Sequence, residues 1–541
     1  MTDDSMMTGD NPQEPQEPQG PQELQGPQQP QGPQQPQGPQ QPQGSQEPQE
    51  PPEPHRLQEP EEPEELQEPE EPEELQELQE LQGPQEPDGP QISVAEALAE
   101  KIALIRPGSL PASITRKCQD LLIDVVGLCV TARNEDYVVS ALNSCDDGGI
   151  CTAIGHMRML TATGASFVNG TAAHGEDFDD TFEGGPVHAG AVIVPAVLAA
   201  CERHNPDGRM ALIGIAVGAE VLCRLSLVAP KAVHKAGFHP TAVFGAMGAA
   251  AGVSAALGFD TLQIVDALGI AGSMASGIIE YLAEGAWTKR LHAGWAAQSG
   301  VRAALLAREG FVGPRTVFEG VHGLFNGFAH TAEGNYDALV DGFGERWVID
   351  TLAFKPYPCG TMAQPYIDCA RRLAARGVHP EDVAQIVCEV AEGTVHRLWE
   401  PLADKKRPPN GYAAKFAVPY LLATGFVYGG VGLGAFTEGA IRDERVLALA
   451  DKVSYIIDPD NPYPDNYTGH IRAILQDGTV VEERQPHLRG GAQEPLTRQD
   501  VIDKFILNVE HGGWTKAHTV AALKLIAVLY SDRIDLTVLR G

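Results

Sequence analysis

Apolar positions recur at helical spacing along much of the chain after residue 92. Ser93 precedes an alanine-rich amphipathic stretch that ends near Ile105. A second stretch, Ala112–Ala132, carries Leu121 and Val125 on one face. Such spacing predicts amphipathic helices. Longer runs rich in small residues predict closely packed helices at Ala189–Glu202, Ala211–Val228, Thr241–Leu257, Thr261–Glu284 and His292–Glu309.

Alternation of apolar and polar residues, which is typical of strands, begins only near residue 380. Gln385–Gly393 is one such segment, and His470–Pro486 is another. In the second, Asp477-Gly478 lies between two alternating runs and predicts a hairpin turn. The chain then returns to helical patterns at Thr497–Asn508 and Thr519–Tyr530.

This order of elements predicts a mainly α fold with two domains. A large all-helical domain is expected from residues 92–348 together with 491–541, and a smaller α+β lid domain from 349–490. The helical domain is therefore expected to be discontinuous, with a ligand cleft between it and the lid.

The first 91 residues have a different composition. Residues 1–90 hold 21 of the 42 prolines, 23 acidic residues and one basic residue, Arg56. Their glycines recur every sixth position from Gly20, which does not fit the every-third spacing of collagen. With so few apolar residues, we expect residues 1–91 to be a disordered acidic tail.

Charge and cysteine content narrow the classes of function. The whole chain has 73 acidic and 39 basic residues, a net charge of −34, which argues against nucleic acid as a partner. Nine cysteines without a CxxC pair predict reduced thiols, and no secretory signal is recognisable, so a cytoplasmic protein is expected. The charge-free run Pro240–Gly258 is rich in Ala and Gly, and we interpret it as a buried helix rather than a membrane span.

The densest group of reactive side chains lies in HGEDFDDTFEGGPVHAG, residues 174–190. Carboxylates this close together disfavour one another's ionisation, so some must be paired or protonated. Two apolar segments that are expected to be helices flank the group, SFVNGTAA before it and AVIVPAVLAA after it, which favours partial burial and a functional role. Its titratable members are His174, Glu176, Asp177, Asp179, Asp180, Glu183 and His188.

Further candidates are spread along the chain. His239 opens a helix of small residues, where an imidazole can meet an anionic ligand. Basic groups within apolar surroundings need a counter-charge, which a carboxylate substrate would supply. We find no nucleotide-binding fingerprint, nucleophile elbow or Walker sequence, so acid–base chemistry on a small anion is favoured. The other candidates are Lys289, Arg290, His292, Lys355, Tyr357, His396 and Arg397.

Five motifs in order, DFDDT, FHPT, TKRLHAG, KPYPC and AAKFAVPY, resemble those of the MmgE/PrpD family. This family includes 2-methylcitrate dehydratase, cis-aconitate decarboxylase and iminodisuccinate epimerase. The resemblance covers residues 92–541 and implies a helical domain with an α+β lid, a homodimer, and catalysis without a cofactor or metal.

The resemblance also places the active-site positions of the family on Asp177, Thr181, His188, His239 and Lys289. In this interpretation Lys289 and His188 hold substrate carboxylates, and His239, with Asp177 nearby, moves a proton next to a carboxylate. Arg290, His292, Lys355, Tyr357 and His396 are expected to help bind the substrate.

Three places in the chain depart from the family pattern. Animal cis-aconitate decarboxylases look to have a histidine at the position of Gly360. They also look to have a tyrosine close to the position of Val395-His396. Gln364 replaces the usual histidine a few residues after KPYPC. These departures favour a hydro-lyase resembling 2-methylcitrate dehydratase, with an epimerase or decarboxylase of the same family as the alternative.

Two functional hypotheses outside this family are also considered. Asp179, Asp180 and Glu183 resemble the Mg²⁺-binding sequence of prenyl-diphosphate cyclases, although aromatic residues make up only 6% of the chain. Alternatively, residues 92–541 are an inactive scaffold and the acidic tail carries the function. The leading expectation remains an enzyme for a small anionic carboxylate, with neither nucleic acid nor membrane as a partner.

Overall fold

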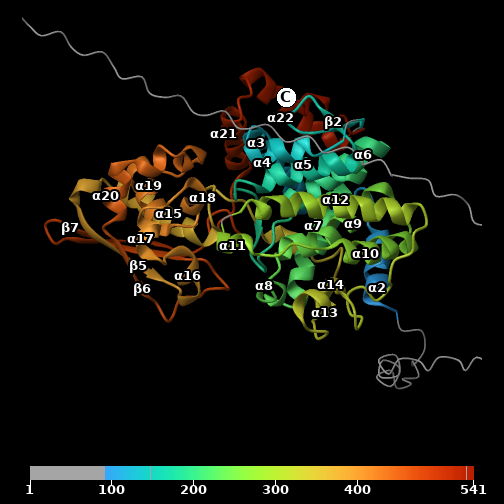
Figure 1. Ribbon diagram of the computed structural model, residues 1–541, viewed down its shortest axis with the longest axis horizontal. Coiled ribbons are helices and arrows are strands. Elements are labelled where there is room, and N and C mark those ends of the chain that lie inside the picture. Colours follow the sequence, from blue (N-terminus) through green and yellow to red (C-terminus); the bar gives the residue numbers. More distant parts are fainter. Residues whose placement is uncertain (1–91, 147, 285, 532) are drawn as a thin grey trace, which may run out of the picture. The chain divides into compact units, whose positions relative to one another are not determined.

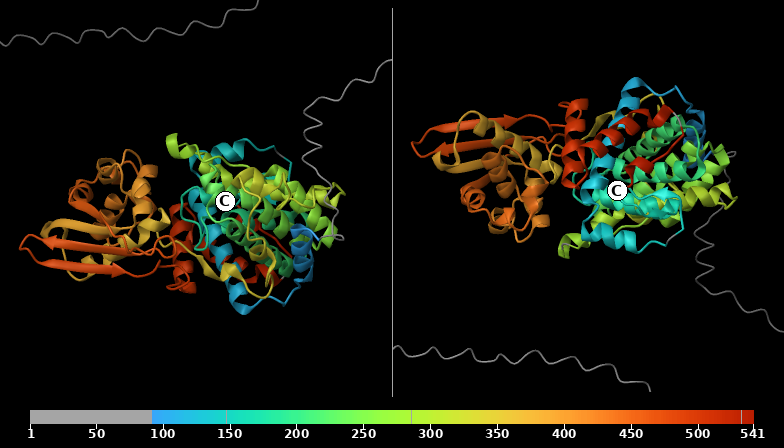
Figure 2. Two further views of the ribbon diagram at one scale, coloured as in Figure 1. Left: turned by 90° about the horizontal axis from the view of Figure 1, so that it is seen from below. Right: turned by 90° about the horizontal axis from the view of Figure 1, so that it is seen from above.

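In the computed structural model, residues 92–541 are described, except 147, 285 and 532. They form two separate hydrophobic cores. We call the elements around the first core the helical region and those around the second core the lid region. Figures 1 and 2 show the lid sheet on the side away from α10. The mainly α fold is confirmed, whereas the expected tail lies outside the described residues and the domain boundaries at 348/349 and 490/491 remain a prediction.

The helical region is built from long buried helices and a C-terminal pair. Its elements are α2 (Val94–Leu104), α3 (Ala112–Ala132), α4 (Asp136–Asn143), α5 (Ala162–His174), α6 (Gly190–His204), α7 (Gly208–Val228), α8 (Ala232–Lys235), α9 (Pro240–Leu257), α10 (Thr261–Met274), α11 (Tyr281–Glu284), α12 (Thr288–Arg308), α13 (Leu324–Ala329), α14 (Asp337–Val340), α21 (Arg498–His511) and α22 (Lys516–Val528). The C-terminal helix α21 packs against α3, which returns the end of the chain to the first core.

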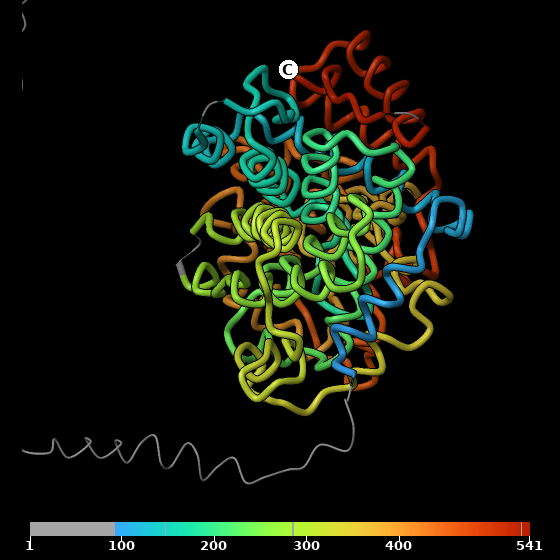
Figure 3. Tube along the Cα trace, turned by 90° about the vertical axis from the view of Figure 1, so that its right-hand side faces the viewer, coloured from blue at the N-terminus to red at the C-terminus, as the bar shows by residue number. Residues whose placement is uncertain are grey.

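Helix α9 is the centre of the helical region. It packs against α7 on one side and against α12 on another, and Figure 3 shows α12 nearly end-on in the middle of this region. Every residue from Pro240 to Ala256 is buried, which confirms the interpretation of this run as a core helix. Helices α7 and α9 are long and apolar enough to cross a membrane, but most of each is buried inside the protein.

The lid region contains one four-stranded sheet with helices. Its strands run in the order β6-β5-β7-β8, with β5 and β6 parallel and the other pairs antiparallel. The hairpin predicted at Asp477-Gly478 joins β7 to β8, and Gly478 has the positive φ that such a turn requires. The elements are α15 (Gln364–Ala375), β5 (Val383–Val390), α16 (Val395–Leu398), α17 (Leu402–Lys406), α18 (Gly411–Ala414), α19 (Val418–Tyr428), α20 (Glu444–Ala450), β6 (Val453–Ile457), β7 (Gly469–Leu475) and β8 (Val480–Gln485).

Two short strand pairs complete the structure. β1 (Cys151–Thr152) pairs with β2 (Met159–Leu160). β3 (Thr181–Phe182) pairs with β4 (Leu352–Ala353), so the acidic loop after α5 is joined directly to the segment that enters the lid region. This pairing fixes the loop relative to Lys355 and the KPYPC motif.

The predicted helix over Thr261–Glu284 is wrong at its C-terminal end. Helix α10 ends at Met274, because Ala275 adopts an extended backbone with ψ of 145°, and a turn of helix returns only at α11. The helix expected at His292–Glu309 begins four residues earlier, at Thr288. Lys289 and His292 therefore lie in the first turns of one helix, on the same side of it as the acidic loop.

Helix α6 is capped by a buried carboxyl group from the acidic loop. Asp180 accepts hydrogen bonds from the backbone N–H groups of Ala189 (3.0 Å) and Gly190 (2.8 Å). Burial, together with the charges of Asp179 and Asp124, raises the pKa of Asp180 to about 7. This cap holds one end of the loop at the start of α6.

The contact between α7 and α9 depends on glycines. A Cβ atom at Gly218 would lie 2.7 Å from Ile193 Cγ2 and 2.8 Å from the carbonyl oxygen of Gly248. We predict that Gly218→Ala lowers the free energy of unfolding by about 1–3 kcal/mol, because the two backbones would have to separate. Thermal or urea unfolding measures this. Gly327→Ala, at a helical glycine with open space, is the control and is expected to cause no loss; equal stability of the two variants would contradict the packing argument.

The buried cap predicts a pH-dependent effect of Asp180→Asn. Because the pKa of Asp180 is higher in the folded protein than its usual 3.8, the stabilisation that comes from its proton is fully present below about pH 4 and is lost as the pH rises through 7. Asparagine carries no such cost, so the unfolding temperature of the variant relative to wild type should rise by several degrees between pH 5 and pH 8. Asp260→Asn, which removes the exposed capping carboxylate of α10, is the matched control. A constant difference for Asp180→Asn would contradict the raised pKa.

Candidate active site

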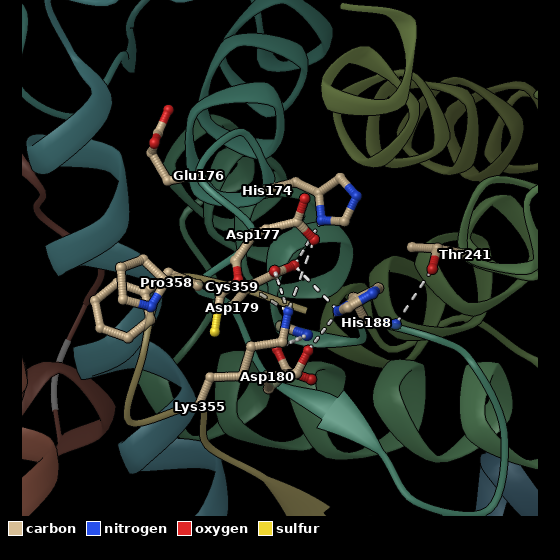
Figure 4. A network of polar contacts seen from close by, with 12 residues as sticks. His174, Glu176, Asp177, Asp179, Asp180, His188, Thr241, Lys355, Pro358 and Cys359 are labelled. Carbon is tan, nitrogen blue, oxygen red and sulfur yellow. Dashed lines mark hydrogen bonds and ion pairs between the residues drawn. The ribbon is translucent and has the colours of Figure 1, made fainter. Parts of the chain in front are cut away.

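The acidic loop between α5 and α6 is the centre of a buried polar cluster (Figure 4). Asp177 has a left-handed backbone, with φ of 54°, which is uncommon for a residue other than glycine. Its carboxylate accepts a hydrogen bond from Lys289 Nζ at 2.5 Å and another from the Tyr412 hydroxyl at 3.3 Å. Lys355 Nζ donates to its carbonyl oxygen at 3.0 Å. One residue thus contacts α12, the entry to the lid region and α18.

Electrostatics explain how these charges remain buried. Burial alone would raise the pKa of Asp177, but the charges of Lys289 and Lys355 overcome it and hold that pKa well below its usual range. Burial lowers the pKa of Lys289, and Asp177 opposes that change. The pair is therefore a buried ion pair whose lysine already has its counter-charge.

Four histidines lie beside this ion pair. The ring of His174 lies 4.9 Å from that of His188 and 5.7 Å from that of His239, and His239 lies 5.2 Å from His292. The Nδ1 atoms of His239 and His292 are 3.1 Å apart, so one ring donates to the other. Tyr281 packs edge-on against both of these rings. Three helices and the acidic loop supply the four imidazoles.

The tautomer of His188 follows from its partner. Its Nδ1 lies 2.6 Å from the carbonyl oxygen of Asp180, and since a carbonyl only accepts, Nδ1 carries the proton. In the neutral ring Nε2 then has a free lone pair. Burial lowers the pKa of His188 to about 3 and that of His292 to about 4, and it lowers the pKa of His239 well below its usual value. At neutral pH these rings are therefore uncharged.

The remaining carboxylates of the loop have structural partners. Asp179 lies 2.7 Å from Nδ1 of His174, and its other oxygen lies 4.0 Å from Lys355 Nζ. Glu176 is bound by Lys415 Nζ at 2.9 Å and by the Tyr137 hydroxyl at 3.0 Å. Lys415 and Tyr412, from the AAKFAVPY segment and the residues just before it, therefore join the lid region to the loop.

A cavity of about 570 Å³ adjoins the histidines. Its walls are mostly apolar, and His292 and Tyr281 connect it to the cluster. All of its lining residues come from the helical region, although the sequence predicted a cleft shared with the lid. They are Ala242, Ser276, Gly277, Ile278, Glu280, Tyr281, Ala286, Thr288, Leu291, His292 and Trp295.

The structure brings most of the predicted site residues together. Asp177, His188, His239, Lys289, His292 and Lys355 lie in the cluster. Thr181 is buried in β3 next to it. Arg290 stacks on the rings of Tyr137 at 4.3 Å and Tyr412 at 4.8 Å, on the outer side of Asp177.

Two predicted residues lie elsewhere. The Tyr357 hydroxyl donates to Asp368 at 2.6 Å and accepts from Arg371 and Arg489, which forms a separate network within the lid region. His396 in α16 is exposed. Three residues that the sequence did not predict for the site also contact the cluster, namely Tyr281, Tyr412 and Lys415. Of these three, Lys415 alone belongs to one of the quoted motifs, AAKFAVPY.

The magnesium-binding reading receives no support from these contacts. Asp179 pairs with His174, Asp180 caps α6, and Glu183 accepts a hydrogen bond from Ala492 N–H, so the three carboxylates serve different partners. Ligand atoms of His174, Asp179 and His188 do lie within 4.8 Å of one another, as in a metal site. The charge of Lys355 next to Asp179 disfavours a cation there, and we assign no metal to the cluster.

Comparisons with known proteins agree with this geometry. The MmgE/PrpD N-terminal domain matches residues 96–337, and the MmgE/PrpD C-terminal domain matches residues 357–525. Human cis-aconitate decarboxylase is 29% identical over 77% of this chain and 88% of its own length. The cis-aconitate decarboxylase-like protein oryM of Aspergillus oryzae is 26% identical over 77% of this chain and 90% of its own length.

A dehydratase is also similar, over a shorter stretch. The 2-methylcitrate dehydratase of Escherichia coli is 24% identical over 40% of this chain and 46% of its own length. Family models cover most of the described residues, and the motifs quoted above lie within them, apart from Lys355 and Pro356 of KPYPC, which precede the second match. The chain belongs to the MmgE/PrpD family.

Proposed function

We propose that this protein is a cofactor-independent lyase that removes a proton next to a carboxylate of a small polycarboxylate. The observation that carries the proposal is the group of neutral, buried imidazoles beside the Lys289–Asp177 pair. A neutral imidazole accepts a proton near neutral pH, and nearby cations stabilise the negative charge that develops on the substrate. We further propose that the enzyme acts as a cytoplasmic homodimer.

The proton acceptor is one of two histidines in this proposal. His188 has a defined tautomer with a free Nε2 lone pair, and His239 is bonded through Nδ1 to His292. Abstraction of the proton converts the adjacent carboxylate into an enediolate, which carries one more negative charge. Loss of a hydroxide from the neighbouring carbon, protonated as it leaves, then gives the alkene and water.

Dehydration is the reaction that we favour within the family. At Gly360, where animal decarboxylases are expected to have a histidine, the ring of Phe416 fills the adjacent space. A Cβ atom at Gly360 would lie 3.2 Å from Phe416 Cδ1, so any side chain at this position would require that ring to shift slightly. Decarboxylation is the second candidate, because the two relatives aligned over most of the chain carry decarboxylase names.

All nine cysteines are free thiols, and this agrees with the cytoplasmic location that we propose. Burial raises the pKa of several of them, including Cys118 and Cys359, which leaves them unreactive. A thiol nucleophile therefore has no place in the mechanism.

Solvent exchange tests the proposed chemistry directly. Citrate, 2-methylcitrate, cis-aconitate and amino-dicarboxylates are incubated with the enzyme in D₂O and followed by NMR. We expect deuterium to enter at a carbon next to a carboxylate, and the product identifies dehydration, decarboxylation or epimerisation. If no member of the panel exchanges or reacts with correctly folded enzyme, the proposal fails.

Single substitutions test the residues. His239→Ala and Lys289→Ala should each reduce turnover about a hundredfold or more, because a positioned acid–base group contributes 10²–10⁴-fold. His188→Ala should have a comparable effect if His188 is the proton acceptor. His204→Ala, at a half-buried histidine at the end of α6, serves as the matched control and should be as active as wild type. Near-normal turnover of both His239→Ala and Lys289→Ala would contradict the assignment.

A further inference from the structure

The lysines of the site already have protein carboxylates as partners. Lys289 is 2.5 Å from Asp177, and Lys415 is 2.9 Å from Glu176. Lys355 lies 3.8 Å from the carboxylate of Asp177 and donates to the carbonyl oxygen of that residue. A substrate carboxylate that enters the site therefore meets cations whose charge is largely neutralised. A polycarboxylate needs additional positive charge to balance its own.

Arg397 in α16 is a cation of a different kind. Its guanidinium makes neither an ion pair nor a side-chain hydrogen bond within the described part of the chain, and it lies 5.9 Å from the centre of the Phe416 ring. The residue is half-buried, so its charge is partly shielded from water. A guanidinium in this position has five donors available for a planar anion.

The position of Arg397 relates it to the catalytic cluster. Lys289 Nζ lies 6.0 Å from the ring of Phe416 that Arg397 also contacts, so the two cationic groups are at most about 12 Å apart. If each substrate carboxylate lies about 2.8 Å from a nitrogen of its cationic partner, a chain of a few carbons between two carboxylates can span the remaining distance. Burial raises the pKa of Tyr281 to about 12, and the charge of Arg397 opposes that rise, so Arg397 lies near Tyr281, whose ring packs edge-on against His239.

The backbone of Arg397 is held in place independently of its side chain. Lys405 Nζ donates to the carbonyl oxygens of Arg397 at 2.7 Å and of Phe416 at 3.0 Å. Two residues on, Trp399 is fully buried and packs edge-on against Tyr366. The lid region thus presents an unpaired guanidinium from a fixed turn of helix, which lowers the entropy cost of binding an anion.

We propose that Arg397 binds a substrate carboxylate from the lid side, opposite the Lys289–Asp177 pair, so that the substrate carries at least two carboxylates. This role rests on the proposed lyase function. It assigns the substrate contact of this segment to Arg397 rather than to the exposed His396. The bidentate geometry of a guanidinium favours a carboxylate over a hydroxyl or carbonyl group.

Binding measurements test this proposal with tricarballylate, a saturated tricarboxylate that cannot be dehydrated. Titration calorimetry compares wild type with Arg397→Gln and Arg397→Lys. We expect Arg397→Gln to weaken tricarballylate binding about tenfold to a hundredfold and Arg397→Lys to weaken it less, since the charge is kept and the bidentate contact is lost.

The control is Arg445→Gln, which removes an exposed arginine of the lid region that pairs with Asp443. It should bind tricarballylate as wild type does, and unfolding temperatures confirm that all variants are folded. If wild type binds tricarballylate and Arg397→Gln binds it as tightly as Arg445→Gln does, the role of Arg397 is overturned. If wild type neither binds tricarballylate nor catalyses exchange on the substrate panel, the proposed function itself fails.

Steady-state kinetics with the substrate found in the panel give a second measurement. Because Arg397 contacts a carboxylate that does not react, its loss should raise KM by the same tenfold to hundredfold and leave kcat within a few-fold of wild type. A variant that lost kcat with KM unchanged would point instead to a disturbed lid, and would contradict a binding role.

Discussion

The ion pair between Asp177 and Lys289 is the interaction on which the site depends. A buried carboxylate is costly unless cations and donors surround it, and here Lys289, Lys355 and Tyr412 provide them from three distant segments. Removal of Lys289 would leave the carboxylate of Asp177 without its closest cation in the interior. The left-handed backbone of Asp177 is tolerated because these contacts, together with the cap that Asp180 makes on α6, define the loop on both sides.

This arrangement also sets the protonation of the histidines. Burial is the largest cause of the low pKa of His188 and of His239, and the charges of nearby lysines and of neighbouring histidines add to it. The same cations that neutralise Asp177 therefore keep the imidazoles unprotonated. A site of this kind has proton acceptors at neutral pH and little uncompensated charge. The charge that attracts a polyanionic substrate has to come from groups outside the ion pair, such as Arg397 in the lid region.

Sequence patterns predicted the elements with clear periodicity and missed those without it. Helix α3 has the bounds that its apolar spacing predicts. Helix α5 was expected only as the short apolar segment SFVNGTAA, because the helix is buried almost all round and its small residues show no polar face that would mark its start at Ala162. The acidic loop was recognisable by the density of its titratable groups. Its contacts with Tyr412 and Lys415 were not, since they join residues more than 230 positions apart. Tyr357 was assigned to the site by its motif, but its hydroxyl faces Asp368.

The two halves of the site differ in how much change they can accept. On the helical side each group is bonded to another: His174 to Asp179, His239 to His292, and Lys289 to Asp177. Substitution of one member leaves its partner unsatisfied, so this half is constrained as a unit. On the lid side, the nearest neighbours of a Cβ atom at Gly360 would be a phenylalanine ring and a backbone carbonyl, and the Arg397 side chain has no polar partner in the described chain. Differences in reaction and substrate within the family are therefore expected to arise mainly from the lid, while the proton-transfer half remains unchanged.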